Sequence, residues 1–433
     1  MTAQQEGNST RAQLLERFPE EADITEEGEL VIGGCPVSDL AAQYGTPAYL
    51  VDEIGLRRQI RRFIDGLSAR WPNSEVLFAS KSLPCVAMYA IAQSEGLSVD
   101  VAGGGELVMA LAAGVDPDRI YLHGNSKSDA EIQMALDAGI RGIVVDNFDD
   151  LDRLDRLATT RQGVLLRMIP GIETQTHASQ ATGGHDSKFG LPVDQLRQAI
   201  ERVNTSPLLR LDGIHVHVGS QILDSAPFAS AVRSVAELGP FSTYDIGGGL
   251  GVPYTDGETA PSVEEYLDVI VAAARELLPA SAKLMIEPGR SIVARAGITL
   301  YSVNTVKSTA KTFVAVDGGM ADNLDIALTG QRYDAVIATR MTEPRTVLSD
   351  VVGRQCESGD LLVGEVKLSR PQRGDLLAMP MTGAYAYTMA NNYNGALIPP
   401  IIFCAEGMSR LGAERQTYED LLHLHRPALQ GSW

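Results

Sequence analysis

Hydrophobic and polar positions follow one rhythm in the first two thirds of this chain. From about residue 76, short runs of β-branched and aliphatic residues alternate with segments whose apolar residues recur at helical spacing. The eight runs are VLFASK, SVDVA, IYLHG, GIVVD, VLLRMI, GIHVHVG, YDIGGG and KLMIEPG. Segments between them, such as GELVMALAAG and DAEIQMALDAG, end in glycine, as helices often do. Eight strand–helix units in succession predict an α/β fold, a (β/α)8 barrel, over residues 46–295.

The rhythm changes after about residue 295. Runs rich in β-branched residues, such as ITLYSVNTV and KTFVAVDGG, are now joined by turn residues and few long helices. This pattern predicts a C-terminal β-rich, barrel-like domain over residues 296–433, which is an ordinary domain length. Residues 1–45 hold one short helical stretch and the strand-like GELVIGG. Because the eight barrel units are already filled, we expect this N-terminal segment to pack with the C-terminal β domain.

Composition excludes several classes of partner. The 433 residues, 44% hydrophobic and 21% charged, are those of an ordinary globular protein. A formal net charge of -19 would repel nucleic acid. The polar N-terminal stretch lacks the apolar core of a signal peptide, and no segment is long enough to span a membrane. We therefore expect a cytoplasmic protein with neither nucleic acid nor membrane as a partner. The four cysteines are widely spaced and indicate neither a zinc knuckle nor a disulfide framework.

Candidate chemistry appears where the barrel runs end, since functional residues of such barrels gather at the carboxyl ends of the strands. The first run ends in Lys81, whose amine is a candidate nucleophile, although a lone lysine there is more often a surface residue. The sixth run carries His215 and His217 on one face. A zinc site would need a third protein ligand, which the neighbouring sequence does not supply, so we assign no metal.

The last two runs end in groups suited to an anion. Residues 247–251 read GGGLG, where backbone N–H groups can cradle a phosphate, although a tight turn explains such a run equally well. The eighth run ends in Glu287 and Arg290, which alone could be a salt-bridged strand end. Taken together, the amine, imidazole, glycine cradle, guanidinium and carboxylate are the groups that bind pyridoxal 5'-phosphate.

Ten segments in order resemble one enzyme family. They are FASKS, SVDVAGGGE, IYLHGNSKS, HDSKFG, GIHVHVGSQ, DIGGGLG, IEPGRS, VDGGMADN, CESGD and TGAYAYTMANNYN. They resemble diaminopimelate decarboxylases, members of the alanine-racemase-like class of pyridoxal phosphate enzymes that includes eukaryotic ornithine decarboxylase, over about residues 30–425. The resemblance implies a carboxy-lyase that converts the small amino-acid substrate meso-2,6-diaminopimelate to L-lysine and CO2. It also implies a homodimer with shared active sites.

The resemblance also assigns roles to particular residues. Lys81 is expected to hold the cofactor as a Schiff base, His217 to stack on its ring, and Glu287 to bond the ring nitrogen. A carboxylate there keeps the ring protonated and able to accept electrons. Other cofactor contacts that the resemblance implies are Asp100, Glu106, Ser220, Gly247, Gly248, Gly249, Gly289, Arg290 and Tyr385. Cys356 is expected to donate a proton in the partner's site, although a lone cysteine is usually a small core residue.

The substrate-binding positions depart from the family pattern. The resemblance places Arg290, Glu357 and Tyr385 around the substrate. The family's distal arginine and tyrosine, however, correspond here to Asp325 and Thr329. Losing the partner of a buried charge costs about 2 to 5 kcal/mol. The alternative is therefore a substrate with a cationic tail, such as lysine, ornithine or a modified diamino acid.

Three further alternatives stay open at this point. Arg332 follows shortly after Thr329 and could supply the distal guanidinium for diaminopimelate, which we favour as the substrate. An amino-acid racemase and a non-catalytic pyridoxal phosphate carrier use the same barrel and lysine. The CESGD motif and the long C-terminal β domain favour a decarboxylase over both.

Overall fold

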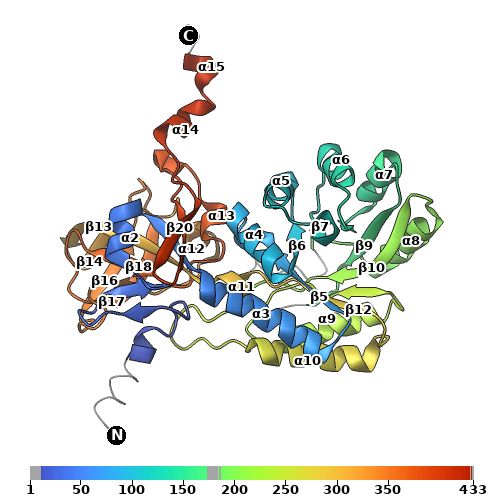
Figure 1. Cartoon of the computed structure of the whole chain (residues 1–433), viewed down its shortest axis with the longest axis horizontal. Helices are drawn as coiled ribbons and strands as arrows, with labels where there is room; N and C mark the ends of the chain where they lie inside the picture. The colour runs from blue at the N-terminus through green and yellow to red at the C-terminus, as the bar shows by residue number, and fades with distance from the viewer. Residues whose placement is uncertain (1–10, 173–183, 185–186, 430, 432–433) are drawn as a thin grey trace. The chain divides into compact units, whose positions relative to one another are not determined.

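The computed structural model describes residues 11–172, 184, 187–429 and 431 of the chain (Figure 1). These residues form two compact units. The barrel unit comprises residues 57–252 and 259–292. The β unit comprises the described residues up to 56, residues 253–258, and the described residues from 293 onward. The predicted fold class, a (β/α)8 barrel with a separate β domain, is confirmed.

Eight parallel strands close the barrel in the order β10-β11-β12-β5-β6-β7-β8-β9. They are β5 (Ser74–Ala79), β6 (Ser98–Val101), β7 (Ile120–Leu122), β8 (Gly142–Val145), β9 (Gln162–Met168), β10 (Leu209–Val216), β11 (Thr243–Asp245) and β12 (Lys283–Ile286). Inside the barrel a small core forms from Leu77, Tyr121, Val144, Leu165 and Met285. Each strand is therefore buried on both faces, which explains why the eight runs read as nearly continuous apolar sequence.

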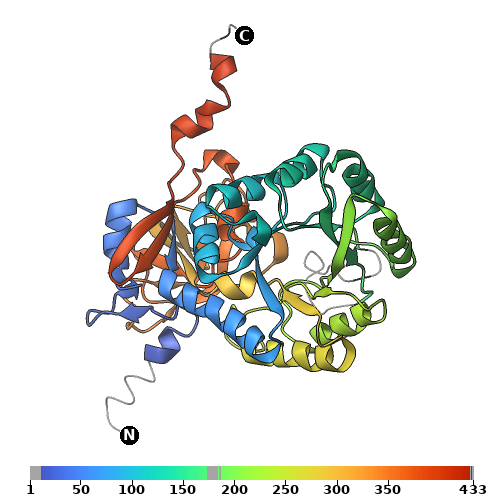
Figure 2. The same cartoon turned by 45° about the vertical axis from the view of Figure 1, so that its right-hand side comes forward.

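Helices surround these strands (Figure 2). The helix α3 (Glu53–Arg70) precedes β5, and the strands are followed in turn by α4 (Val86–Glu95), α5 (Gly104–Ala112), α6 (Asp129–Ala138), α7 (Phe148–Leu157), α8 (Val193–Thr205), α9 (Ala226–Ala236), α10 (Val263–Leu277) and α11 (Arg290–Val293). Local sequence fixes several ends. Ser128 caps α6 in a capping box with Glu131, and Gly96 and Gly139 end α4 and α6 in the left-handed conformation. Among the described helices, none is long and apolar enough to cross a membrane.

The β unit contains a nine-stranded sheet whose main path is β17-β16-β14-β13-β4-β19-β20. Its strands are β4 (Ala48–Asp52), β13 (Gly297–Ser308), β14 (Thr312–Val316), β15 (Val336–Ile337), β16 (Val347–Val352), β17 (Leu361–Leu368), β18 (Leu376–Met379), β19 (Ile401–Ala405) and β20 (Met408–Ala413). A second sheet of β1 (Asp23–Ile24), β2 (Leu30–Ile32) and β3 (Cys35–Pro36) precedes α2 (Val37–Tyr44). Shorter helices are α12 (Leu324–Thr329), α13 (Ala386–Met389), α14 (Tyr418–His423) and α15 (Arg426–Leu429).

The N-terminal segment shares a core with the later strands of the β unit. Leu30 and Ile32 of β2 pack in one cluster with Ile298 of β13 and Ile402 of β19. The strand β4 falls within residues 46–56, which the sequence pattern assigned to the barrel, yet it pairs with β13 and β19 in the β unit. An apolar run such as AYLVD does not reveal which sheet it will join, because strand pairing is a non-local choice.

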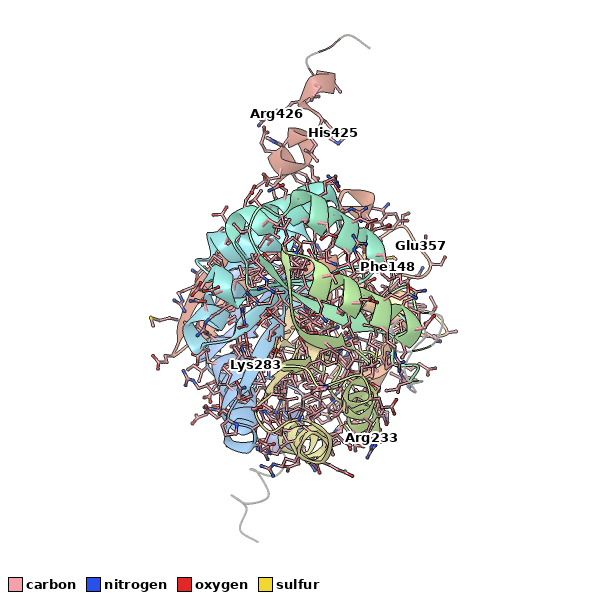
Figure 3. All side chains as sticks on the ribbon, turned by 90° about the vertical axis from the view of Figure 1, so that its right-hand side faces the viewer. Phe148, Arg233, Lys283, Glu357, His425 and Arg426 are labelled. Atoms are coloured by element: carbon pink, nitrogen blue, oxygen red, sulfur yellow. The ribbon has the colours of Figure 1, made fainter. Side chains whose placement is uncertain are left out.

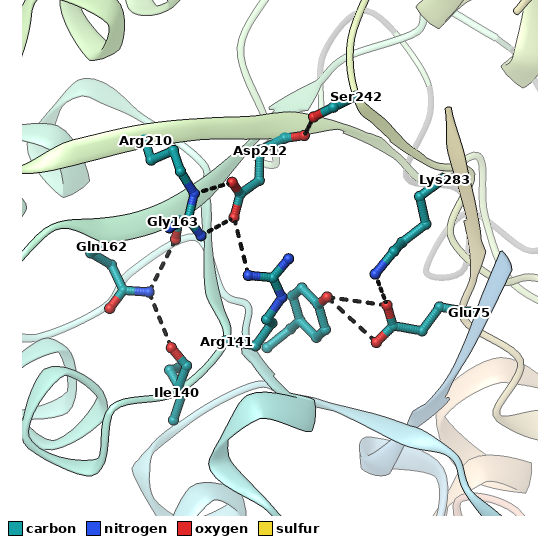
Figure 4. A network of polar contacts seen from close by, with 10 residues as sticks. Glu75, Ile140, Arg141, Gln162, Gly163, Arg210, Asp212, Ser242 and Lys283 are labelled. Carbon is teal, nitrogen blue, oxygen red and sulfur yellow. Dashed lines mark hydrogen bonds and ion pairs between the residues drawn. The ribbon is translucent and has the colours of Figure 1, made fainter. Parts of the chain in front are cut away.

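Polar side chains close the end of the barrel at which the strands begin (Figure 4). The Glu75 carboxylate accepts hydrogen bonds from Lys283 Nζ at 2.8 Å and Ser98 Oγ at 2.5 Å, and Tyr121 OH lies 3.4 Å from it. Across the barrel, the Asp212 carboxylate accepts from the Arg210 guanidinium at 2.8 Å. Networks at this end of such a barrel serve stability.

Replacing Glu75 with alanine should lower the free energy of unfolding by about 1 to 3 kcal/mol, because three donors lose their partly buried acceptor. Urea unfolding of the purified protein measures this. Glu276→Ala, at an exposed position of α10, is the matched control and should change stability by less than about 0.5 kcal/mol. Equal effects of the two substitutions would show that the network adds nothing to stability.

Candidate active site

The candidate site lies at the carboxyl ends of the barrel strands. Lys81 belongs to the 3-10 helix η1 (Ser80–Ser82) directly after β5, Asp100 lies in β6, and His215 lies in β10. The glycine loop, residues 247–251, follows β11, and Glu287 follows β12. Because parallel strands end at the same rim, these side chains converge although they are far apart in sequence.

Glu287 occupies the centre of this group. Its side chain is 5% exposed, and its two carboxylate oxygens face two different imidazoles. His123 Nε2 lies 3.1 Å from Oε1, and His215 Nε2 lies 3.2 Å from Oε2. The two rings pack edge to face with centroids 5.1 Å apart. Burial alone would raise the pKa of Glu287, but the two histidines hold that pKa well below its usual range, so the carboxylate is ionised.

Two further buried carboxyl groups, Asp245 and Asp100, interact electrostatically with Glu287. Burial raises the pKa of Asp245 well above its usual value, and the neighbouring Glu287 raises it further. Asp245 Oδ1 accepts the Gly247 N–H at 2.9 Å. Burial also raises the pKa of Asp100 to about 6, although His123 opposes the shift. These shifts favour the protonated form of Asp245, whereas Glu287 retains the negative charge.

His217 is held as a neutral ring. Burial lowers the pKa of His217 well below its ordinary value, and the nearby Lys81 lowers it further. Its Nδ1 accepts the backbone N–H of Gly248 at 3.2 Å, which ties the ring to the glycine loop. A neutral, fixed imidazole presents a flat face at the barrel mouth.

The glycine loop requires its glycines. Gly247 and Gly249 have φ of 70° and 115°, and a Cβ on Gly248 would lie 2.0 Å from the Glu287 carbonyl oxygen. Close by, Arg290 Nη2 donates to Ser220 Oγ at 3.3 Å. Gly289 has a similar constraint, since its Cβ would lie 2.9 Å from that of Ala79. These groups place backbone N–H groups, a hydroxyl and a guanidinium on one rim, which suits phosphate oxygens.

Lys81 is exposed at the barrel mouth, and its position is fixed by its neighbour Ser80. Ser80 Oγ donates to Glu106 Oε2 at 2.7 Å, and Glu106 also accepts the Ala102 N–H at 2.7 Å. Glu106 therefore positions the turn that carries Lys81.

Three buried residues of the site were not identified from the sequence. His123 stands next to the end of the run IYLHG, so inspection of every strand end would have found it. Asp245 is the last residue of β11 but lies near the start of the run YDIGGG, so the run did not mark it as a strand end. The third is Arg167 in β9, whose guanidinium carbon lies 4.5 Å above the Phe189 ring centroid. Its position in the middle of an apolar run gave no signal.

The remaining expected site residues belong to the β unit and are described within it. Cys356 and Glu357 are exposed in a turn, and Figure 3 shows Glu357 at the surface. The Cys356 N–H donates to Asn394 Oδ1 at 2.7 Å. Asp360 accepts the backbone N–H groups of Gln355 and Met320, each at 2.7 Å, and so fixes this turn.

Asp325 and Thr329 lie on α12, and Tyr385 immediately precedes α13 with a φ of 63°. Asp325 is 5% exposed. Its carboxylate oxygens lie 3.2 Å from Tyr333 OH and 3.3 Å from Thr329 Oγ1. Hydroxyl groups of its own unit thus contact this carboxylate.

The polar groups of this site could hold either a metal ion or pyridoxal phosphate. His123, His215 and Glu287 place one ligand atom each within 4.8 Å of the others, so the structure supplies the third ligand that the sequence near His215 did not. Pyridoxal phosphate accounts for more of the site. Oε1 of Glu287 lacks a hydrogen bond of good geometry and can accept one from a ring N–H, and the glycine loop, Ser220 and Arg290 match the phosphate.

Comparison with known proteins agrees with this assignment. Residues 56–294 match the family described as pyridoxal-dependent decarboxylase, pyridoxal binding domain. A diaminopimelate decarboxylase of Actinosynnema pretiosum subsp. auranticum is 44% identical over 414 residues, covering 92% of each chain. The crystal structure of diaminopimelate decarboxylase from M. jannaschii with L-lysine has a TM-score of 0.87 at 29% identity, covering 93% of this chain and 97% of that one. Lysine/ornithine decarboxylase from Vibrio vulnificus, complexed with putrescine, has a TM-score of 0.73 at 25% identity and covers 86% and 97%.

Gly248→Ala should weaken pyridoxal phosphate binding at least about tenfold and destabilise the protein by about 1 to 3 kcal/mol, because the added methyl group overlaps the Glu287 backbone. Equilibrium dialysis and thermal unfolding measure the two effects. Gly105→Ala is the control, since that glycine lies in α5 with nothing within 4 Å of its Cβ position. Unchanged binding by Gly248→Ala would place the cofactor away from this loop.

Proposed function

This chain belongs to the diaminopimelate decarboxylase family of pyridoxal-dependent decarboxylases, and from that membership we propose that it converts meso-2,6-diaminopimelate to L-lysine and CO2. The observation that most supports the proposal is the set at the barrel mouth, where an exposed amine, a neutral imidazole and an ionised carboxylate converge. Membership also favours decarboxylation over the racemase and carrier alternatives.

Bound pyridoxal phosphate supplies an electron-accepting ring that takes up the electron pair left when CO2 departs. In our proposal Lys81 holds the cofactor through its amine, and His217 lies flat against the ring. Glu287 accepts a hydrogen bond from the ring nitrogen. Because this carboxylate is ionised and buried, it favours a protonated ring nitrogen.

The phosphate end is assigned to Ser220, Arg290 and the glycine loop on the same rim. Ser220, Arg290 and the glycine loop offer a hydroxyl, a guanidinium and backbone N–H groups. Such groups bind a dianion firmly without moving protons. Tyr385 completes this set by resemblance alone. Asp100 interacts electrostatically with His123 and Glu287.

We assign proton donation after CO2 loss to Cys356, acting in the site of a partner subunit. Cys356 and Glu357 are exposed, and their turn is fixed by Asp360 and Asn394, so a rigid reactive turn faces outward from its own unit. That arrangement supports a homodimer with shared sites. All four cysteines are free thiols, which suits the cytoplasm as the compartment.

The residues expected around the substrate's distal end are where this chain departs most from the family pattern. Buried Asp325 lies within hydrogen-bond distance of Tyr333 and Thr329, and this contact favours a structural role for it over direct substrate binding. Arg332, three residues beyond Thr329, is exposed and carries a guanidinium that can bind the distal carboxylate.

A second candidate is decarboxylation of lysine, ornithine or another diamino acid with a cationic tail. It is favoured by the two acidic residues at the expected substrate end, Asp325 and Glu357. The likeness of the fold to lysine/ornithine decarboxylase is compatible with it.

Incubating the cofactor-loaded protein with meso-diaminopimelate, L- and D-lysine, L- and D-ornithine and L-arginine should release CO2 from meso-diaminopimelate at least about tenfold faster than from the others, since a hydrogen-bonding site rejects substrates that leave its polar groups unpaired. Labelled CO2 capture measures the rates, with Lys81→Ala as the inactive control. Release from cationic substrates alone would overturn the diaminopimelate assignment and favour the second candidate.

Mixing Lys81→Ala subunits with Cys356→Ala subunits should restore activity, because one site of each mixed dimer is then intact. Random reassociation gives about a quarter of wild-type activity. Each variant alone should be inactive or nearly so, and native mass spectrometry confirms that mixed dimers form. Verified mixed dimers without activity would rule out shared sites.

A further inference from the structure

Glu287 is contacted by two histidines, His123 and His215, to which the proposed cofactor set gives no role. His123 follows β7, His215 lies in β10, and Glu287 follows β12, so three separate strands converge on one carboxylate. Each carboxylate oxygen has its own imidazole Nε2, at 3.1 and 3.2 Å. All three side chains are at most 7% exposed. A buried carboxylate without such partners takes up a proton.

The two imidazoles differ in charge. Burial lowers the pKa of His123, but the Asp100 and Glu287 carboxylates outweigh burial and raise that pKa above its ordinary value. Burial lowers the pKa of His215 to about 4, although Glu287 opposes the shift. The raised pKa favours the imidazolium form of His123, whereas His215 is a neutral ring that can donate one hydrogen bond.

We propose that His123 and His215 are positioning residues for the cofactor's ring nitrogen: His123 keeps the Glu287 carboxylate ionised, and His215 fixes its orientation. This inference rests on the proposed function only in requiring that pyridoxal phosphate bind with its ring nitrogen at Glu287. The charge that holds the ring nitrogen protonated then depends on a residue that acts through Glu287.

The other charged groups around Glu287 make His123 necessary. Asp100, a buried carboxyl group whose pKa is about 6, disfavours negative charge on Glu287 when it is ionised. Arg167 and Lys81 are the other cations in this field. In the proposed function Lys81 would hold the cofactor, and the Arg167 guanidinium lies 4.0 Å from the Asp146 carboxylate. His123 is the cationic group in contact with the carboxylate.

The same substitution at the two histidines separates charge from orientation. Glutamine carries an amide nitrogen that can reach about as far as the histidine Nε2, so it retains a hydrogen-bond donor and cannot become a cation. At His215, which is already neutral, glutamine should preserve the state of Glu287. At His123, glutamine removes the charge that keeps Glu287 ionised.

The experiment measures the protonation of the ring nitrogen directly, by 15N NMR of holoenzyme loaded with pyridoxal phosphate labelled at that nitrogen. We expect the signal of a protonated ring in the wild type and in His215→Gln. His123→Gln should shift toward the signal of Glu287→Gln, which serves as the reference for a lost carboxylate. Its dissociation constant for pyridoxal phosphate should rise about tenfold or more. His215→Leu, which removes the donor, should also weaken binding.

Several outcomes would overturn the inference. A protonated ring in correctly folded His123→Gln would show that the charge of His123 is not required, and equal behaviour of the two glutamine variants would remove the division of roles. An unprotonated ring in the wild type would defeat the inference while leaving CO2 release, and hence the proposed function, intact. Circular dichroism and thermal unfolding exclude misfolded variants from the comparison. Failure of the wild type to bind pyridoxal phosphate would instead defeat the proposed function.

Discussion

One buried negative charge governs the active site of this decarboxylase. Glu287 must remain ionised in a place where burial alone would neutralise it, and it does so because two imidazoles contact its two oxygens. The pKa of Asp245, one strand away, is instead raised by burial and by Glu287, which favours its protonated form. Charge is therefore sorted among neighbouring carboxyl groups by their contacts, as is usual where titratable groups crowd a functional site. Pyridoxal chemistry depends on that sorting, because a protonated ring is the better acceptor of electrons.

The barrel makes this arrangement possible by separating its two ends. At the end where the strands begin, polar groups such as Glu75 and Lys283 satisfy one another in a static network. At the other end, glycines replace side chains so that backbone segments can touch. Gly248 packs against the Glu287 carbonyl and Gly289 against Ala79. The glycine loop is thus part of the packing that sets the position of Glu287. If it also binds the cofactor's phosphate, as we propose, cofactor binding is coupled to this carboxylate.

The β unit holds an exposed cysteine on a turn that side-chain hydrogen bonds fix. The turn that carries Cys356 is held by the Asp360 carboxylate and by Asn394, so an exposed thiol is presented on a fixed backbone. Asp325 stands where the family pattern has an arginine, and its carboxylate lies within hydrogen-bond distance of Tyr333 in its own unit. Charge reversal at such a position need not reverse specificity when the new carboxylate is hydrogen-bonded elsewhere.

The sequence by itself determined the fold class, and it predicted most of the candidate cofactor set. Eight apolar runs with helices between them specify a closed parallel barrel, and the rule that such barrels work at their strand ends selects Lys81, His217, Glu287 and Arg290. Only the tertiary structure decided that β4 joins the β unit, that His123 reaches Glu287, and that the pKa of His123 is raised while that of His215 is lowered. The physical reason is the same in each case. Strand pairing and pKa values depend on neighbours far away in the chain, whereas periodicity and strand-end chemistry are local properties that a sequence displays directly.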